Sequence, residues 1–267
     1  MIKSNSFPIG IFDSGIGGTS IWKEINTLLP SENTIYLADS KNAPYGDKSK
    51  EDIINLSIKN TEILLKKNCK LIVVACNTAT TNAIKVLRNK YDVPFIGIEP
   101  AIKIAALNTK TNTIGILATK GTLNSELFEK TSNTLNKEIK IIEIIGKGLV
   151  ELIESEKIES EAMKKLLSSY VSPLIKKNAD CLVLGCTHYP YLIPQIKEIV
   201  GNHIQIIDSG EAVARQTKAI LNKNSLLNTS NNQNSLHHFF INKDKKVMEM
   251  FVDQKKTKNI TITKKEF

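Results

Sequence analysis

The sequence predicts an α/β protein of two similar halves, each a doubly wound parallel sheet, with an active site in the cleft between the halves. Apolar runs of strand length alternate with longer helical patterns along almost the whole chain, as in a parallel sheet built from βα units. The apolar runs are continuous rather than alternating, which indicates strands buried on both faces. Two short segments also recur later in the chain in the same order, which favours two related halves.

The expected strands are short apolar runs bounded by polar or turn residues. They are Pro8–Phe12, Thr34–Leu37, Leu71–Ala75, Pro94–Ile98, Thr113–Ala118, Ile139–Ile145, Cys181–Gly185 and Ile204–Ile207. Helical patterns lie between them, such as Thr19–Leu29, which Pro30 closes, and Glu51–Lys67. The second of these opens with two acids and ends in lysines, an arrangement that suits the helix dipole.

The internal repeat rests on two pairs of segments. Ile9–Phe12 resembles Ile114–Leu117 at a shift of 105 positions, and Leu71–Thr78 resembles Cys181–His188 at a shift of 110. Either likeness alone means little, because apolar strands resemble one another by chance. Together they predict two homologous α/β domains, one formed by residues 1–98 plus 211–267 and the other by residues 99–210.

The end of the chain is predicted to extend the first domain rather than to form a third one. Asn222–Ser235 is rich in Asn and Ser and has the composition of a loop. A strand at Leu236–Ile241 and a short helix at Lys246–Val252 are expected to follow it.

The composition is that of a soluble globular protein, with 41% hydrophobic and 24% charged residues. No apolar run approaches the roughly 20 residues that span a bilayer, and the first residues lack the apolar stretch of a signal peptide. We therefore expect a cytoplasmic protein that does not bind membranes. Four cysteines in a chain of this length do not predict a disulfide framework, and they are expected to be reduced in the cytoplasm. None of their spacings is C-x-x-C, so no structural zinc site is predicted.

The net charge of +9 does not by itself indicate a nucleic-acid-binding protein. Residues 236–267 hold eight lysines and four acids, so +4 of the charge lies in that last stretch. The other lysines are dispersed among residues rich in Asn and Ile, which indicates a compositional bias more than a phosphate-binding face. Charge of this kind bears on solubility and nonspecific association. We do not expect nucleic acid to be the main partner.

Each half places a cysteine directly after a buried strand and before a helical pattern. Cys76 precedes a helix expected to begin near Ala79, and Cys186 precedes Tyr191–Val200. Ligands of open α/β sheets bind at the carboxyl ends of the strands, where a helix N-terminus also favours a thiolate. The alternative is a small buried residue at a strand end, which is the commoner fate of a single cysteine. Cys69 and Cys181 lie at strand starts, away from that edge, and are expected to be structural.

Two polar loops follow the first two strands. The glycines of Asp13–Gly18 let backbone amides approach a carboxylate or a phosphate. This loop is not a dinucleotide fingerprint, because G-x-G-x-x-G would require glycine in place of Ser20. The loop Asp39–Gly46 is expected at the same sheet edge, and Asp39 could act like the ribose-binding acid of a nucleotide fold. A nucleotide site therefore stays an alternative.

The chain resembles the glutamate racemase family, within the aspartate/glutamate racemase superfamily. The segments that carry this resemblance are Pro8–Gly18, Pro44–Gly46, Cys76–Thr80 and Gly185–Pro190, supported by Asp208–Gly210 and Ala214-Arg215. They occur in the family's order over residues 8–215. The Cys-Thr-His-Tyr-Pro block is the specific one, because aspartate racemases usually carry an acid where His188 stands.

The resemblance implies an isomerase that interconverts L- and D-glutamate without a cofactor or metal and supplies D-glutamate for peptidoglycan synthesis. It implies that Cys76, assisted by Asp13, removes the α-proton of D-glutamate. Cys186, assisted by His188, would remove that of L-glutamate. The residues that match substrate-binding positions of the family are Asp13, Ser14, Tyr45, Gly46, Asn77, Thr78, Thr187 and His188.

A departure from the family pattern concerns Glu154. The family often has a Cys-Pro pair shortly before a glutamate that acts as an auxiliary acid, and Gly146-Lys147 stand at that pair here. Glu154 is the glutamate that aligns, so it is the candidate auxiliary catalytic residue. The alternative is a solvated helix charge beside Glu151 and Glu156.

Two rival functions remain open on the sequence. One is a racemase for aspartate or another amino acid, which a comparison of turnover on glutamate and aspartate would distinguish. The other is a nucleotide- or DNA-binding module, suggested by the glycine loop and the basic tail. The expected partner is a small-molecule substrate, and the sequence leaves open whether the chain forms a homodimer.

Overall fold

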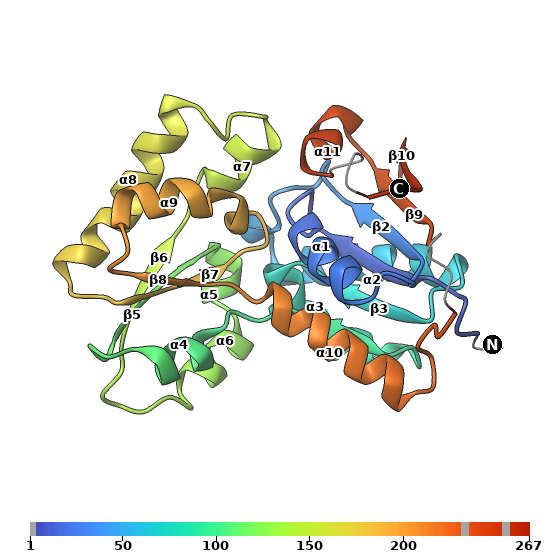
Figure 1. The fold of residues 1–267 in the computed structure, drawn as a ribbon, viewed down its shortest axis with the longest axis horizontal. Coiled ribbons are helices and arrows are strands. Elements are labelled where there is room, and N and C mark those ends of the chain that lie inside the picture. The colour runs from blue at the N-terminus through green and yellow to red at the C-terminus, as the bar shows by residue number, and fades with distance from the viewer. Residues whose placement is uncertain (1–3, 231–234, 253–256) are drawn as a thin grey trace.

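A computed structural model describes residues 4–230, 235–252 and 257–267, and it contains two all-parallel sheets side by side (Figure 1). The larger sheet has the strand order β10-β9-β2-β1-β3-β4, and the smaller one has the order β6-β5-β7-β8. The strands are β1 Ile9–Asp13, β2 Thr34–Ala38, β3 Leu71–Val74, β4 Phe95–Gly97, β5 Thr113–Ala118, β6 Lys140–Ile145, β7 Cys181–Gly185, β8 Gln205–Ile207, β9 His237–Ile241 and β10 Ile260–Lys264.

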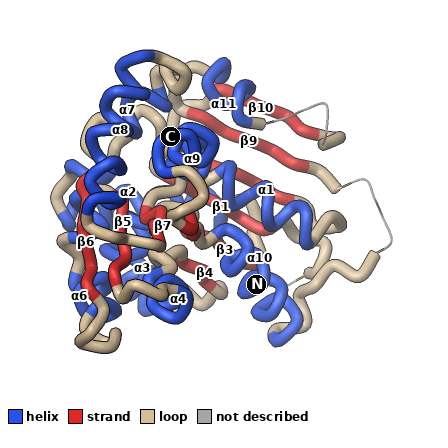
Figure 2. Tube along the Cα trace, turned by 60° about the vertical axis from the view of Figure 1, so that its left-hand side comes forward, coloured by secondary structure: helices blue, strands red, loops and turns tan. Residues whose placement is uncertain are grey.

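Helices cover both faces of each sheet, so most strands are buried on two sides, as continuous apolar runs require (Figure 2). The helices are α1 Thr19–Leu28, α2 Lys50–Lys66, α3 Asn77–Lys90, α4 Ile102–Asn108, α5 Lys120–Leu123, α6 Glu126–Ser132, α7 Leu149–Glu154, α8 Glu161–Lys176, α9 Ile193–Val200, α10 Gly210–Lys223 and α11 Lys245–Phe251. Two short 3-10 helices, η1 Tyr45–Asp47 and η2 Tyr189–Leu192, complete the described elements.

The core is divided by the sheets into layers. In the larger sheet, Ile9 and Ile11 face α1, α10 and α11, while Phe12 faces α2 and α3. In the smaller sheet, α7, α8 and α9 pack on one face and α4, α5 and α6 on the other (Figure 1). One continuous apolar cluster joins the α1 side of the larger sheet to the α7–α9 side of the smaller one. The two halves are therefore packed together as well as connected by the chain.

The internal repeat seen in the sequence corresponds to a repeat in topology. β1 lies between β2 and β3, and β5 lies in the same way between β6 and β7, with a fourth strand at the β3 and β7 sides. The two repeated sequence segments are β1 with β5 and β3 with β7. The prediction of two similar doubly wound parallel sheets is confirmed. The larger sheet adds β9 and β10 beyond β2, which are absent from the smaller one.

The observed elements differ from the expected ones mainly at their ends. The helix expected near Ala79 begins at Asn77, because Cys76 itself is the N-cap. The C-terminal strand and helix are present at His237–Ile241 and Lys245–Phe251, but β10 was not expected. Part of the expected loop, residues 231–234, lies outside the described residues. None of the described helices is long and apolar enough to cross a membrane.

Candidate active site

The carboxyl ends of strands from both sheets meet around one small cavity. The volume of this cavity is about 10 Å³, which is room for about one water molecule. The residues that line it are Ser14, Pro44, Tyr45, Gly46, Cys76, Asn77, Thr78, Thr119, Val150, Cys186, Thr187 and His188. The cavity thus brings together the two cysteines that follow β3 and β7, the strands that repeat in sequence and in topology.

Cys76 is fixed at the N-terminus of α3. Its Sγ accepts a hydrogen bond from Ala79 N at 3.4 Å and donates one to Ser14 Oγ at 3.6 Å. Burial, and then the negative charge of Asp13, raise the pKa of the Cys76 thiol far above its ordinary value. In this arrangement Cys76 is a protonated thiol, which is the form that can donate a proton.

Asp13 ends β1 and is fully buried. Its Oδ2 accepts hydrogen bonds from Gly15 N and Gly18 N, both at 3.1 Å, and its Oδ1 accepts one from Thr187 Oγ1 at 3.2 Å. Burial raises the pKa of Asp13 to about 6, although the neighbouring His188 and the two amide bonds oppose the rise. The carboxyl group can therefore change its protonation close to neutral pH.

Cys186 is the first member of a hydrogen-bonded series. Its Sγ lies 3.8 Å from His188 Nδ1, and His188 Nε2 lies 2.7 Å from Glu154 Oε1. Burial opposes a charge on the ring, but the hydrogen bonds with Cys186 and Glu154 raise the pKa of His188 well above its ordinary value. Burial likewise opposes a charge on Glu154, but its bond with His188 and one from Ile16 N hold its pKa low. Both shifts therefore favour a proton on the ring, paired with the Glu154 carboxylate.

Glu154 is the residue for which the alternative interpretation was wrong. A solvated helix charge would be exposed, whereas Glu154 is 4% exposed and bonded to both halves of the molecule. The exposed Glu151 and Glu156 beside it fit the solvated description instead. The same carboxylate explains part of the glycine loop, because a Cβ on Gly15 would lie 1.9 Å from Glu154 Oε1. The loop glycines thus admit protein carboxylates to the backbone amides.

Asn77 has a side chain for which the protein supplies no partner. It is 2% exposed, and neither its Nδ2 nor its Oδ1 has a hydrogen-bonding partner. A buried amide left unpaired costs free energy unless a ligand or water bonds to it. Because Asn77 lines the cavity between the two cysteines, its amide is free to bind a polar group there.

Hydroxyl groups connect the two halves at the rim of the cavity. Thr78 Oγ1 lies 2.7 Å from Thr119 Oγ1 and 3.2 Å from Thr122 Oγ1. Thr119 and Thr122 were not among the residues expected from the sequence. A threonine in a loop gives no signal of its own, and only the packing of α5 against α3 reveals this contact.

Asp39 does not have the free carboxylate that a ribose would need. It is 2% exposed, and both of its oxygens already accept hydrogen bonds from Tyr45, Asn42 and Asn242. Asp39 therefore does not support the alternative of a nucleotide-binding site. Among the residues that the structure describes, no group of three or more His, Cys, Asp or Glu side chains is placed to hold a metal ion.

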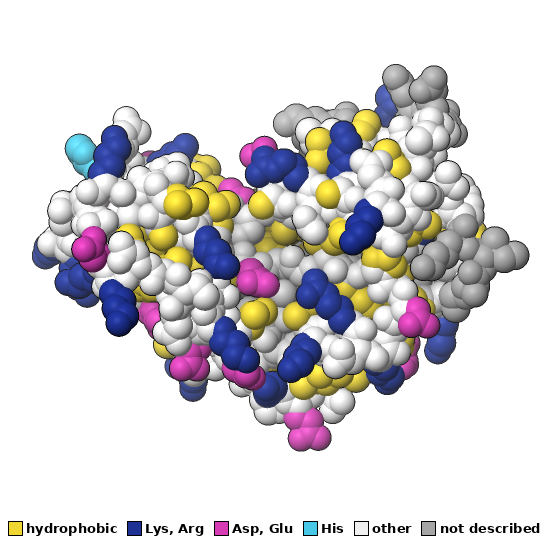
Figure 3. Space-filling view, turned by 90° about the horizontal axis from the view of Figure 1, so that it is seen from below, with side chains coloured by type: hydrophobic (Ala, Val, Ile, Leu, Met, Phe, Trp, Pro, Cys, Tyr) yellow, Lys and Arg dark blue, Asp and Glu magenta, His cyan; other side chains and the backbone are white. Residues whose placement is uncertain are grey.

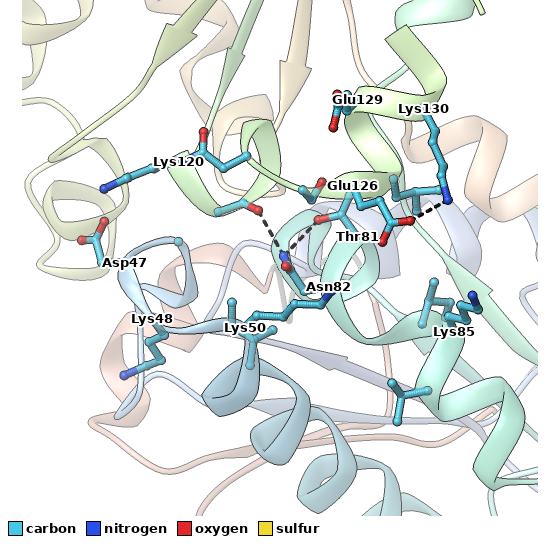
Figure 4. A pocket seen from close by; sticks show the side chains of 18 residues that line it. Asp47, Lys48, Lys50, Thr81, Asn82, Lys85, Lys120, Glu126, Glu129 and Lys130 are labelled. Atoms are coloured by element: carbon cyan, nitrogen blue, oxygen red, sulfur yellow. Dashed lines mark hydrogen bonds and ion pairs between the residues drawn. The ribbon is translucent and has the colours of Figure 1, made fainter. Parts of the chain in front are cut away.

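A larger groove of about 730 Å³ adjoins this cavity on the outside (Figure 4). It lies between η1, α2 and α3 of the first half and α5 and α6 of the second, and both acids and lysines line it. Its Lys130 and Glu126 form an exposed ion pair at 2.6 Å. On the face seen in Figure 3, basic and acidic side chains are interspersed rather than gathered by sign. That face does not have the single-sign stripe that is typical of nucleic-acid-binding proteins.

Residues 9–217 match the family model of Asp/Glu/hydantoin racemases, and this stretch contains both cysteines, Asp13, Glu154 and His188. The chain belongs to this racemase family. It is 44% identical over 229 residues to a glutamate racemase of Herpetosiphon aurantiacus, covering 86% of this chain and 90% of that one. It is 41% identical over 244 residues to a glutamate racemase of Clostridium perfringens, covering 91% and 94%.

Solved structures of the racemase family have the same fold. A glutamate racemase isoform from Bacillus anthracis superposes with a TM-score of 0.85 at 31% identity, covering 97% of each chain. A glutamate racemase from Francisella tularensis in complex with D-glutamate gives a TM-score of 0.82 at 30% identity, covering 97% of this chain and 98% of that one. This chain thus shares its fold with these glutamate racemases over almost its whole length.

Proposed function

We propose that this protein is a glutamate racemase that inverts the α-carbon without a cofactor: one of the two thiols Cys76 and Cys186 removes the α-proton and the other donates a proton to the opposite face. The observation that carries the proposal is that cysteines at equivalent positions of the two halves line one cavity, each beside groups that can hold a proton. Inversion needs a base on one face of the carbon and an acid on the other, so the two groups must come from opposed walls. That the relatives are named glutamate racemases is the reason to propose glutamate as the substrate.

In the L-to-D direction Cys186 is the base. Its proton can pass to His188 Nδ1, since the sulfur and the nitrogen are 3.8 Å apart, and Glu154 stabilises the resulting imidazolium. The Cys186 thiolate then removes the α-proton of L-glutamate. Cys76, held as a thiol, donates its own proton to the opposite face of the α-carbon.

Product formation leaves Cys186 as a thiol and Cys76 as a thiolate, so the two sulfurs have exchanged roles. The D-to-L reaction runs in reverse from that state, with Asp13 as the carboxylate that assists Cys76. Proton exchange with solvent, once the product has left, restores the first state. Each turnover therefore removes one proton from one face of the α-carbon and adds another at the opposite face, and it requires no redox partner.

The carbanion between the two transfers is the costly species, and fixed donors can stabilise its charge. The Asn77 amide and the hydroxyl groups of Thr78 and Thr187 are the side chains on the cavity wall that suit the substrate carboxylates. Ser14, Tyr45 and Gly46 complete that wall. The small volume of the cavity would exclude water once the substrate is enclosed.

We further propose that the halves are domains with the limits 1–98 plus 211–267 and 99–210. The chain passes from the larger sheet to the smaller one after β4 and returns after β8. The resemblance to bacterial glutamate racemases supports peptidoglycan synthesis as the use of the D-glutamate product.

The test is an L-to-D glutamate assay in deuterium oxide, with circular dichroism to follow turnover and mass spectrometry to follow the α-position. We expect deuterium at the α-carbon of the product from either enantiomer. Cys76→Ala and Cys186→Ala should each abolish racemisation. The matched controls are Cys69→Ala and Cys181→Ala, which change buried cysteines outside the cavity and should keep turnover.

Substantial turnover by either cavity variant would refute the two-thiol scheme. Retention of the original α-proton in the product would also refute it. Turnover of aspartate at a rate equal to or above that of glutamate would assign the protein to a different substrate within the same family.

A further inference from the structure

Asn242 connects the C-terminal strands to the candidate active site. It directly follows β9, which pairs in parallel with β2, so Asn242 lies beside Asp39, the residue after β2. Both are 2% exposed and belong to the carboxyl edge of the larger sheet, where Asp13 and Cys76 also lie. The last part of the chain thus reaches the site edge, although β9 has no counterpart in the smaller sheet.

The side-chain amide of Asn242 is held at both ends. Its Nδ2 donates to Asp39 Oδ1 at 2.6 Å, and its Oδ1 accepts from Lys41 N at 2.8 Å. An amide that donates on one side and accepts on the other has only one orientation that satisfies both bonds. Asn242 therefore fixes the Asp39 carboxylate and the start of the loop that leads to Tyr45.

Asp39 connects Asn242 to the cavity wall through a hydrogen bond with Tyr45. Its other oxygen, Oδ2, accepts a hydrogen bond from the Tyr45 hydroxyl at 2.6 Å, and that hydroxyl also accepts one from Asn60 Nδ2 at 3.2 Å. The hydroxyl is thereby engaged away from the cavity, while Tyr45 as a whole still lines it. What Tyr45 offers a substrate is its ring and backbone, and their placement depends on Asp39.

We propose that Asn242 is a positioning residue for the racemase site: through Asp39 it sets the placement of Tyr45 and of the Pro44–Gly46 wall against which the substrate binds. The inference rests on the proposed function, because it concerns the binding of glutamate in that cavity. Loss of the Asn242 amide leaves Asp39 Oδ1 with only the bond from Asn42 Nδ2 at 2.8 Å, so the carboxylate can turn and Tyr45 can follow. Substrate binding then weakens more than proton transfer at the two cysteines slows.

The test is a double-mutant cycle with Asn242→Ala, Tyr45→Phe and the double variant, measured as KM and kcat for glutamate in both directions. We expect Asn242→Ala to raise KM roughly tenfold, the size of effect that one charge-assisted hydrogen bond can produce, with a smaller change in kcat. In the Tyr45→Phe background the same substitution should have little further effect, because the connection from Asp39 to residue 45 is already broken.

Two further variants distinguish a positioning role of Asn242 from a contribution to the stability of β9 alone. His237→Ala alters a buried residue at the other end of β9, bonded to Thr34 Oγ1 at 2.8 Å, and should lower Tm without raising KM. Asn242→Asp keeps the shape and the acceptor for Lys41 N but sets a second carboxylate against Asp39. Its KM should therefore fall as pH is lowered and one of the two carboxyls takes up a proton.

Each outcome decides the inference. The positioning role would be overturned if Asn242→Ala raised KM equally in the wild-type and Tyr45→Phe backgrounds, or if it lowered Tm and left KM unchanged. Racemisation by the wild-type protein would still support the proposed function in either case. A wild-type chain that does not racemise glutamate would overturn the proposed function, and the positioning role would fall with it. If Asn242→Ala does not fold, the pH dependence of KM in Asn242→Asp gives the answer.

Discussion

At the scale of single residues, the two candidate thiols differ in the groups beside them. Cys186 is next to His188, whose charge is stabilised by Glu154, and Cys76 is next to Asp13, which keeps it protonated. Equivalent positions in a repeated fold have therefore acquired opposite environments. This asymmetry supports the proposed roles, in which one sulfur accepts a proton and the other donates one.

Glu154→Gln should shift the alkaline limb of the pH–rate profile to lower pH. Glu154 helps to raise the pKa of His188, so without its charge the ring loses its proton at a lower pH. We expect kcat/KM at neutral pH to fall by roughly tenfold to a hundredfold, within the usual range for proton-transfer groups. Glu151→Gln, on the same helix but exposed, is the control. An alkaline limb that does not move would contradict the role of Glu154.

Asp13→Asn should stabilise the fold at neutral pH while reducing racemisation. The Asp13 carboxyl ionises near 3.8 in the unfolded chain but at about 6 in the fold, so the folded state binds this proton more tightly. Stability is therefore lost as pH rises from about 4 to about 6, and a neutral amide avoids that loss. The free energy of unfolding in urea should rise by up to about 3 kcal/mol at pH 7.5. No gain is expected at pH 3.5, and an equal gain at both values would exclude this cause.

At the scale of elements, the loop after β1 is one place where the two halves meet. A Cβ on Gly17 would lie 2.3 Å from His188 Nδ1, so Gly17→Ala must displace the ring or the loop. We expect at least a tenfold loss of kcat, because a misplaced base is a poor proton acceptor. Gly210→Ala meets mainly the flexible Glu24 side chain and should keep turnover. Full activity of Gly17→Ala would show that the ring position is not critical.

The sequence predicted most of the fold, and it named most of the residues that line the candidate cavity. Strand-length apolar runs between helical patterns predicted the first nine strands, because a strand buried on both faces leaves a strong pattern. β10 was missed since Ile260–Lys264 alternates apolar and polar residues at an exposed sheet edge. The motif residues were found through family likeness, whereas Thr119, Asn60 and Asn242 were not. Their roles depend on contacts between residues distant in sequence.

At the scale of the whole molecule, the two halves leave little room between the two cysteines. The cavity between the cysteines has room for about one water, far less than an amino acid. We therefore expect the halves to separate at contacts such as Thr78 with Thr119 when the proposed substrate enters. The chain crosses between the two sheets after β4 and after β8, so these connections are where we expect a hinge.

A disulfide across the halves should arrest turnover. In the double variant Thr78→Cys and Thr119→Cys, the new sulfurs replace hydroxyls that are 2.7 Å apart. We expect the oxidised protein to lose most of its racemisation and its thermal shift with D-glutamate, and a reductant to restore both. The two single variants control for loss of the hydroxyls. Full turnover by the oxidised protein, with the link verified by mass spectrometry, would mean that the halves need not separate.

The place of β9 in the larger sheet has a consequence for biosynthesis. The strands of the smaller sheet, residues 113–207, are translated as one continuous stretch. In the larger sheet, β2 can pair with β9 only after nearly the whole chain has been translated. During that interval the β2 edge is unpaired, which is the state in which nascent sheets aggregate. A chain that stopped before Asn242 would already contain both thiols, yet it would lack the amide that orients Asp39. The last strands to be translated are thus the ones that complete the site.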